Sequence, residues 1–241
     1  LLNRATRILC DWFSKADKYG PLPFDDNFRC IMPEDDGNSP EDLFSDIESL
    51  LNNAFNPVHP GSLAHLDPPP LVFSILGDLI AAGLNNNLLA FELSPSLTLL
   101  EESLCKWFAM KIGFNDYSGG IAASGGTLSN LNALIAARHN AGLDSDPNSV
   151  LLVSDDAHSS FVKCIRIMGL DEANLVRIKT DDKGRMDVHH LRKSLDKCSN
   201  QNQKIIAVVA TLGTTIRGAI DPIKDISELC KERNLWLSLI H

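Results

Sequence analysis

The sequence predicts an α/β fold in which a mostly parallel sheet lies between helices and an N-terminal helical arm precedes it. From residue 150 onward, apolar strand-like runs alternate regularly with helical patterns. The run Ile205–Ala210 is apolar at every position, which is typical of a strand covered on both faces. Residues 1–60 have apolar faces too thin to form a core alone, so we expect them to dock on another surface.

The N-terminal part reads as two helices separated by polar and proline-rich connections. The first helix is predicted over 1–19, and its apolar residues fall on or near one face: Leu2, Ile8, Leu9, Trp12 and Phe13. Pro21, Pro23 and the polar stretch 33–40 form a linker. Pro40 opens a second helix that reaches about residue 53, and the prolines of 56–60 and 67–70 bracket a rigid connection. We therefore assign 1–70 to an arm and linker, and 71–241 to a large α/β domain.

The elements of the large domain follow from their periodicity and their boundary residues. Helices are predicted over 71–83, 95–112, 128–141, 159–169, 187–198 and 222–233. Strands are predicted over 150–154, 175–178 and 205–210, and a fourth begins at 235–236. This strand–helix alternation implies crossover connections and hence parallel strands.

Composition excludes several classes of function. The net charge of −9 argues against a nucleic-acid or anionic-membrane surface, and no apolar run approaches the length of a membrane span. The six cysteines show no metal-ligand spacing and no CxxC. We therefore expect buried free thiols in a reducing cytoplasm, and we expect no bound metal. The chain begins at Leu1 without a signal segment and reads as a fragment.

Three polar clusters stand directly after apolar runs, where the strands of an open α/β sheet present their carboxyl ends to ligands. In the first, Gly125 and Gly126 allow a close backbone approach, and Thr127 adds a hydroxyl at the start of a helix. Helix N-terminal N–H groups can hold a phosphate without any lysine. The alternative is a glycine-rich turn in which Thr127 is an ordinary N-cap.

The second and third clusters each have a structural alternative as well. His158 follows a strand at the mouth of a helix, where Asp155 or Asp156 could serve only as a helix cap. Residues 211–215 supply hydroxyl groups after the most apolar strand, but they could equally form a threonine-rich turn. Together the three clusters indicate a pocket for a phosphorylated, ring-bearing ligand.

The order of these segments resembles that of the group II pyridoxal-phosphate-dependent amino-acid decarboxylases, which include glutamate, aromatic-amino-acid and diaminobutyrate decarboxylases. The resemblance extends over about 165 residues and is carried by these segments: His59-Pro60, 85–87, 92–95, 99–101, 124–130, 157–160, 210–215 and 218–222. It implies the pyridoxal-phosphate transferase fold of type I, truncated here, with 71–241 as the cofactor-binding domain, incomplete at its C-terminus.

The resemblance also implies roles for individual residues. Gly126, Thr127 and the Leu128 backbone would hold the phosphate of pyridoxal 5′-phosphate, His158 would stack on its ring, and Thr211 would lie beneath it. His158 would be the catalytic residue and help to place the carboxylate of an L-amino acid substrate. Family members are homodimers with the active site at the interface, so a homodimer is expected.

Two parts of the family's site are not found in this sequence. The family continues after Trp236 with a His-Val-Asp-Ala-like strand end whose Asp pairs with the ring nitrogen, and its Schiff-base lysine lies further downstream. No lysine here has that context. Residues 237–241, Leu-Ser-Leu-Ile-His, match the translation of a sequencing-library adapter, so we expect the last native residue to be Trp236 or Leu237 and the chain alone to be inactive. Another type I pyridoxal enzyme, or a non-catalytic cofactor-binding or dimerisation module, remain the alternatives.

Overall fold

The computed structural model describes residues 1–18, 20, 28, 32, 35–63 and 67–240. The chain separates into two compact units, Leu1–Ser94 and Pro95–His241. Pro21 and Pro23 of the predicted linker, Pro33 at its end, one of the six cysteines (Cys30) and the last residue, His241, lie outside the described residues. The assignment of 1–70 to an arm and 71–241 to a cofactor-binding domain stays a prediction.

The first unit contains three α-helices, α1 (Leu2–Ser14), α2 (Pro40–Asn52) and α3 (Val72–Leu84), and short 3-10 turns at Ala16–Lys18 and Phe91–Leu93. Helix α2 begins as predicted, with Pro40 in its first turn and the Ser39 side chain accepting a hydrogen bond from the Asp42 N–H. Helices α1 and α2 contact each other, and the Arg4 guanidinium lies 4.2 Å from the centre of the buried Phe44 ring. The prediction that the first helix reaches residue 19 was wrong, because a 3-10 turn replaces it after Ser14.

The second unit holds the sheet and the remaining helices. In chain order these are α4 (Pro95–Lys111), α5 (Gly126–Asn140), β1 (Ser149–Ser154), α6 (Ser160–Ile167), β2 (Leu175–Ile178), α7 (Val188–Asn200), β3 (Lys204–Thr211), α8 (Ile223–Glu232) and β4 (Leu237–Ile240), with a 3-10 turn at Glu172–Asn174. All the predicted elements of this unit are present. The fourth strand begins at Leu237 rather than at 235, although the Trp236 carbonyl already accepts from the Val208 N–H.

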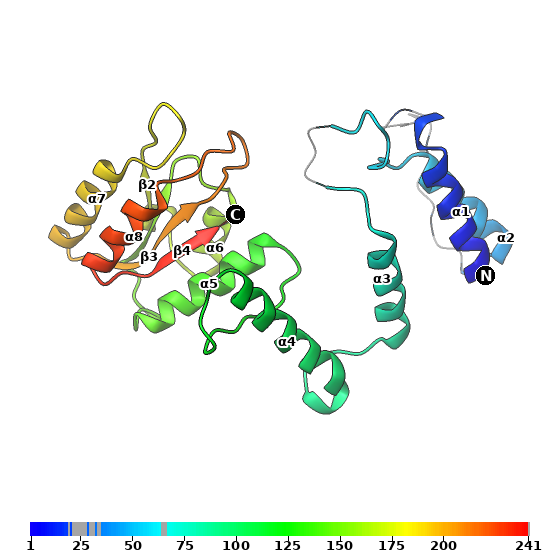
Figure 1. Cartoon of the computed structure of the whole chain (residues 1–241), viewed down its shortest axis with the longest axis horizontal. Coiled ribbons are helices and arrows are strands. Elements are labelled where there is room, and N and C mark those ends of the chain that lie inside the picture. Colours follow the sequence, from blue (N-terminus) through cyan, green and yellow to red (C-terminus); the bar gives the residue numbers. More distant parts are fainter. Residues whose placement is uncertain (19, 21–27, 29–31, 33–34, 64–66, 241) are drawn as a thin grey trace. The chain divides into compact units, whose positions relative to one another are not determined.

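The sheet has the order β2-β1-β3-β4, and every pairing in it is parallel. Helices α5 and α6 cover one face, and α7 and α8 cover the other (Figure 1). The prediction of a mostly parallel sheet between helical layers is therefore confirmed.

Two cores lie on opposite faces of the sheet, and the alternation of side chains along the strands divides them. In β1, Leu151 and Val153 pack toward α5 and α6, whereas Val150 and Leu152 pack toward α7 and α8. A β-bulge interrupts this alternation in β3, because Val150 pairs with Ile205 but Leu151 pairs with Ala207. The extra residue lets two consecutive side chains of β3, Ile206 and Ala207, face the same core.

Helix α5 begins at Gly126, two residues before the predicted start. Glycine is a poor helix former, so the Gly125-Gly126 pair reads as a loop in the sequence. In the first turn, however, the N–H groups have no intrahelical acceptor, and glycine costs less there than in a helix interior. No helix among the described residues is long and apolar enough to cross a bilayer.

Candidate functional site

The site lies at the edge of the sheet where the direction of strand addition reverses. From β1 the chain adds β2 on one side, and β3 then pairs with β1 on the other side. The carboxyl ends of β1 and β3, at Ser154 and Thr211, are therefore neighbours at a topological switch point. Ligands of open α/β sheets bind in the crevice at this position. Two of the three predicted clusters follow directly from these two strand ends.

The first cluster forms the N-terminus of α5. Gly125 is the N-cap, and no side chain caps the helix. The Leu128 N–H donates to the Gly125 carbonyl, whereas the N–H groups of Gly126 and Thr127 have no acceptor among the described residues. A Cβ added at Gly125 or Gly126 would meet nothing within 4 Å. The helix thus presents two free N–H groups and its positive dipole end to open space, which suits an anion.

His158 lies in the loop between β1 and α6, and its side chain is exposed. Its Nδ1 atom accepts a hydrogen bond from the Ser160 N–H at 3.1 Å. The loop itself is tied to the end of β1, because the Asp156 N–H donates to Ser154 Oγ and the Ala157 N–H donates to the Ser154 carbonyl. An exposed imidazole on an anchored loop has a flat face available for an aromatic ligand.

Two contacts join the first cluster to the His158 loop. The Asn130 side-chain amide donates to Ser160 Oγ at 3.1 Å, and the Cys164 thiol lies 3.9 Å from the Thr127 carbonyl oxygen. Helices α5 and α6 therefore meet near their N-terminal ends. The structure brings together the two clusters that are 30 residues apart in the sequence.

Thr211 ends β3 and is buried. Its N–H donates to Asp221 Oδ2 at 2.8 Å, but its hydroxyl is buried without a hydrogen-bond partner among the described residues. The buried Asp221 also accepts from the Met186 N–H at 2.7 Å. Burial raises the pKa of Asp221, and the hydrogen bonds from Thr211 and Met186 oppose that shift. The carboxylate thus closes the turn after β3, where Gly213 adopts a φ of 114° that favours glycine.

A second anchor of the His158 loop was not found from the sequence. Arg217 Nε lies 3.3 Å from Asp156 Oδ2, which joins the loop after β3 to the loop after β1. Gly184 passes directly beside this ion pair, since a Cβ there would lie 2.8 Å from Arg217 Cδ. The sequence places these residues far apart, and an acid followed by a distant arginine gives no signal that they pair.

These residues fit a phosphorylated ring. The phosphate would meet the free N–H groups of Gly126 and Thr127, the ring would face His158, and the unpaired Thr211 hydroxyl would lie at the base of the crevice. The described residues contain no group of three acidic, histidine or cysteine side chains that could hold a metal ion.

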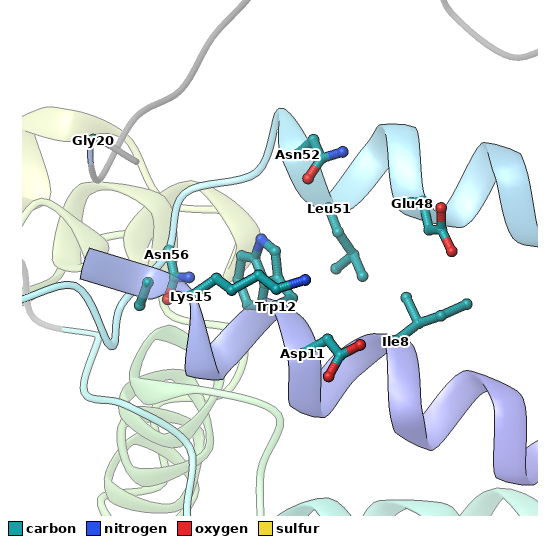
Figure 2. A pocket seen from close by; sticks show the side chains of 10 residues that line it. Ile8, Asp11, Trp12, Lys15, Gly20, Glu48, Leu51, Asn52 and Asn56 are labelled. Carbon is teal, nitrogen blue, oxygen red and sulfur yellow. The ribbon is translucent and has the colours of Figure 1, made fainter. Parts of the chain in front are cut away.

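A pocket of different character lies in the first unit, between α1 and α2. It is lined by ten residues, among them Trp12, Lys15 and Glu48, and Figure 2 labels these side chains. None of the lining residues belongs to the three clusters. The candidate site is therefore defined by the switch point of the sheet and not by this pocket.

Known proteins are similar to this chain in sequence and in fold. A model of the pyridoxal-dependent decarboxylase conserved domain matches residues 31–239. The chain is 31% identical over 211 residues to an aromatic-L-amino-acid decarboxylase of Bacillus atrophaeus, covering 86% of this chain and 43% of the relative. It is 34% identical over 187 residues to an L-2,4-diaminobutyrate decarboxylase of Rhizobium meliloti, covering 78% and 38%.

A solved structure agrees in fold. The glutamate decarboxylase domain of a diaminobutyrate-pyruvate transaminase and L-2,4-diaminobutyrate decarboxylase from Vibrio parahaemolyticus superposes with a TM-score of 0.87 at 23% identity, covering 99% of this chain and 55% of that one. The chain spans less than half the length of both curated relatives above. The match to the family model covers most of the chain, and the chain therefore belongs to the pyridoxal-dependent decarboxylase family.

Proposed function

We propose that the protein containing this chain decarboxylates an L-amino acid with pyridoxal 5′-phosphate as cofactor. The observation that carries the proposal is the meeting of the uncapped α5 N-terminus with the His158 loop at the switch point of the sheet. When bound, pyridoxal phosphate withdraws electrons from the substrate Cα and so lowers the barrier to loss of CO₂. Amino-acid decarboxylation is also the activity named for the relatives from Bacillus atrophaeus and Rhizobium meliloti.

Each site residue then has a distinct task. Gly126 and Thr127 bind the phosphate through their free N–H groups, and Leu128 continues the helix whose dipole favours the anion. His158 stacks on the ring and, as the catalytic residue, orients the substrate carboxylate through its outer nitrogen. Thr211 supports the ring from the base of the crevice with its unpaired hydroxyl.

Phosphate recognition is tested by replacing Gly126 with alanine. The added methyl group points into open space, so the fold tolerates it, but it occupies the volume that a phosphate would enter. We expect Gly126→Ala to unfold at an unchanged or higher urea concentration and to bind pyridoxal phosphate about tenfold more weakly, a loss of about 1.4 kcal/mol. Binding is measured by the absorbance of the cofactor on titration with the chain.

The matched control is Gly77→Ala, since Gly77 lies inside α3 and its added methyl group also meets open space. It should leave the affinity unchanged. Pyridoxal without phosphate should bind the original chain and Gly126→Ala equally. If Gly126→Ala bound pyridoxal phosphate as tightly as the original chain, the phosphate site would be wrong.

Catalysis requires more than these residues supply. By resemblance to the family, the lysine that bonds to the cofactor lies beyond this chain, so we expect the 241-residue chain alone to bind pyridoxal phosphate without turnover. Assays of CO₂ release from a panel of L-amino acids test this in the chain and in a longer protein that carries it. Release by the chain alone would refute the expectation. Cofactor binding without release by the longer protein would favour a non-catalytic module.

We further propose that the protein is a cytoplasmic homodimer. Exposed apolar side chains on α3 (Leu76, Leu79, Ile80) and on α4 (Trp107, Phe108) support a partner surface in each unit, because patches of this kind mark interfaces. Three of the five described cysteines are buried free thiols, which supports a reducing compartment. Light scattering tests the assembly: a monodisperse monomer in the active protein would refute the homodimer.

A further inference from the structure

The direction of the hydrogen bond at His158 determines where its ring proton lies. The donor is the Ser160 backbone N–H, so His158 Nδ1 must be the acceptor and carries no proton. In the neutral imidazole the proton is then on Nε2, the atom farther from the backbone. An imidazole held in this way offers a donor on its outer edge.

The residue that forms this bond is itself held from the neighbouring helix. Ser160 is fully buried at the first position of α6, and its hydroxyl accepts from Asn130 Nδ2 at 3.1 Å. Asn130 lies three residues after Thr127, so the two side chains lie on neighbouring positions of one face of α5. A hydrogen-bonded series therefore runs from Asn130, near the start of α5, through Ser160 to the imidazole.

We propose that Asn130 is a positioning residue that fixes the orientation and the tautomer of His158 by holding Ser160. The contact of the Cys164 thiol with the Thr127 carbonyl reinforces the same junction. The phosphate-binding turn and the ring-stacking residue consequently keep a constant separation, as a ligand with a phosphate and a ring at fixed spacing requires. This inference rests on the proposed function for its purpose, but its geometry does not depend on a bound cofactor.

The test follows His158 itself in the cofactor-free chain, labelled with ¹⁵N at histidine. The His158 signals are assigned by their loss in His158→Gln. In the original chain Nδ1 should show the shift of an unprotonated nitrogen and Nε2 that of a protonated one. Asn130→Ala should move both toward the averaged values of an unconstrained histidine and accelerate exchange of the Ser160 amide about fivefold, the effect of losing one hydrogen bond of about 1 kcal/mol.

Four variants separate positioning from general stability. Asn140→Ala, an exposed asparagine at the other end of α5, should leave the His158 spectrum unchanged. Ser160→Ala and the double variant Asn130→Ala/Ser160→Ala should perturb His158 equally, because both residues act in one series. Asn130→Asp should keep the original His158 spectrum, because the new carboxylate can accept a hydrogen bond from the Ser160 hydroxyl.

The proposal is overturned if Asn130→Ala leaves the His158 nitrogen shifts unchanged, or if the two single changes add in the double variant. If Asn130→Ala fails to fold, the proposal is tested with Asn130→Asp instead. An altered His158 spectrum in folded Asn130→Asp would also overturn the proposal. Affinity for pyridoxal phosphate is measured separately. Failure of the cofactor to bind an unperturbed chain would count against the proposed function and leave the His158 assignment intact.

Discussion

Arg138 is a buried cation whose three hydrogen bonds lock the C-terminal end of α5. Its side chain is 8% exposed and donates to the carbonyl oxygens of Leu143, Met168 and Asp146 at 2.8, 2.7 and 3.2 Å. No carboxylate lies among these partners, so the planar guanidinium serves here as a three-way connector between α5, the following loop and the end of α6. We predict that Arg138→Met destabilises the chain substantially.

The magnitude follows from which carbonyl groups lose their partner. The Leu143 carbonyl keeps the Asp146 N–H, and the Asp146 carbonyl keeps Ser149 Oγ, whereas the Met168 carbonyl has no other partner among the described residues. Hydrogen bonds to a charged donor contribute about 1.5–3 kcal/mol each, but two of the three acceptors remain satisfied and the cost of burying the cation disappears. We therefore expect a loss of about 3 kcal/mol in the free energy of unfolding.

Urea unfolding of the 241-residue chain, followed by circular dichroism, measures this loss as a lower midpoint. Arg138→Lys should lose about 1–2 kcal/mol, because an ammonium group cannot reach three carbonyls in the geometry of the planar fork. Arg166→Met is the control, since the Arg166–Glu172 pair is more than half exposed on both sides and contributes at most about 1 kcal/mol. A midpoint of Arg138→Met equal to that of the original chain would refute the argument that these bonds stabilise the fold.

Substitutions at two further residues, His158 and Asp221, probe the site directly. His158→Ala should weaken the binding of pyridoxal phosphate about tenfold, because the ring that stacks on the cofactor is lost. His158→Phe should keep the affinity within about threefold, because a flat ring remains. If His158→Ala bound the cofactor as tightly as the original chain, His158 would have only a structural role. Asp221→Asn should destabilise by about 1–3 kcal/mol, because its amide NH₂ would face the N–H of Met186 or Thr211. Since burial raises the pKa of Asp221, the folded state binds its proton more tightly than the unfolded state does. The original chain should therefore gain stability relative to Asp221→Asn as the pH falls from the raised pKa toward 3.8. If the urea midpoints of the two proteins differed by the same amount across that pH range, the raised pKa of Asp221 would be contradicted.

The sequence predicted the strands of the second unit well because their patterns are local. A run such as Ile205–Ala210 is apolar at each position, and it forms part of β3 as expected. Nothing in that run marks Ile206 as the extra residue of a bulge, because adjacent apolar side chains look alike whichever core they face. The strand order was also beyond the sequence, since it depends on which side of β1 each new strand adds.

For the candidate site, too, some features could be predicted from the sequence and others could not. The glycines at 125 and 126 and the imidazole at 158 were predicted as site residues because each follows an apolar run and belongs to a short recognisable motif, and their roles stay predictions. The contacts of Asn130 and Arg138 were not predicted, because Ser160 and Met168 lie 30 residues away from them and offer a hydroxyl and a carbonyl group that give no pattern of their own. The nearer partners of Arg138, at Leu143 and Asp146, are backbone carbonyl groups that no sequence pattern marks. Helical periodicity placed Arg138 on α5, but it could not show that a guanidinium would be buried there.

The junction of α5 and α6 carries its own chemical probe. Cys164 is buried against the Thr127 carbonyl, and burial raises the pKa of its thiol, so a thiol reagent can reach and modify it only when the two helices separate. Cys10 is exposed and should react at once, whereas Cys230, whose pKa burial raises to about 11, lies on the opposite face of the sheet and should wait for larger openings. The rate at which Cys164 is alkylated, relative to Cys10 and Cys230, therefore measures how often α5 and α6 separate, and mass spectrometry reads it from native cysteines without any introduced label.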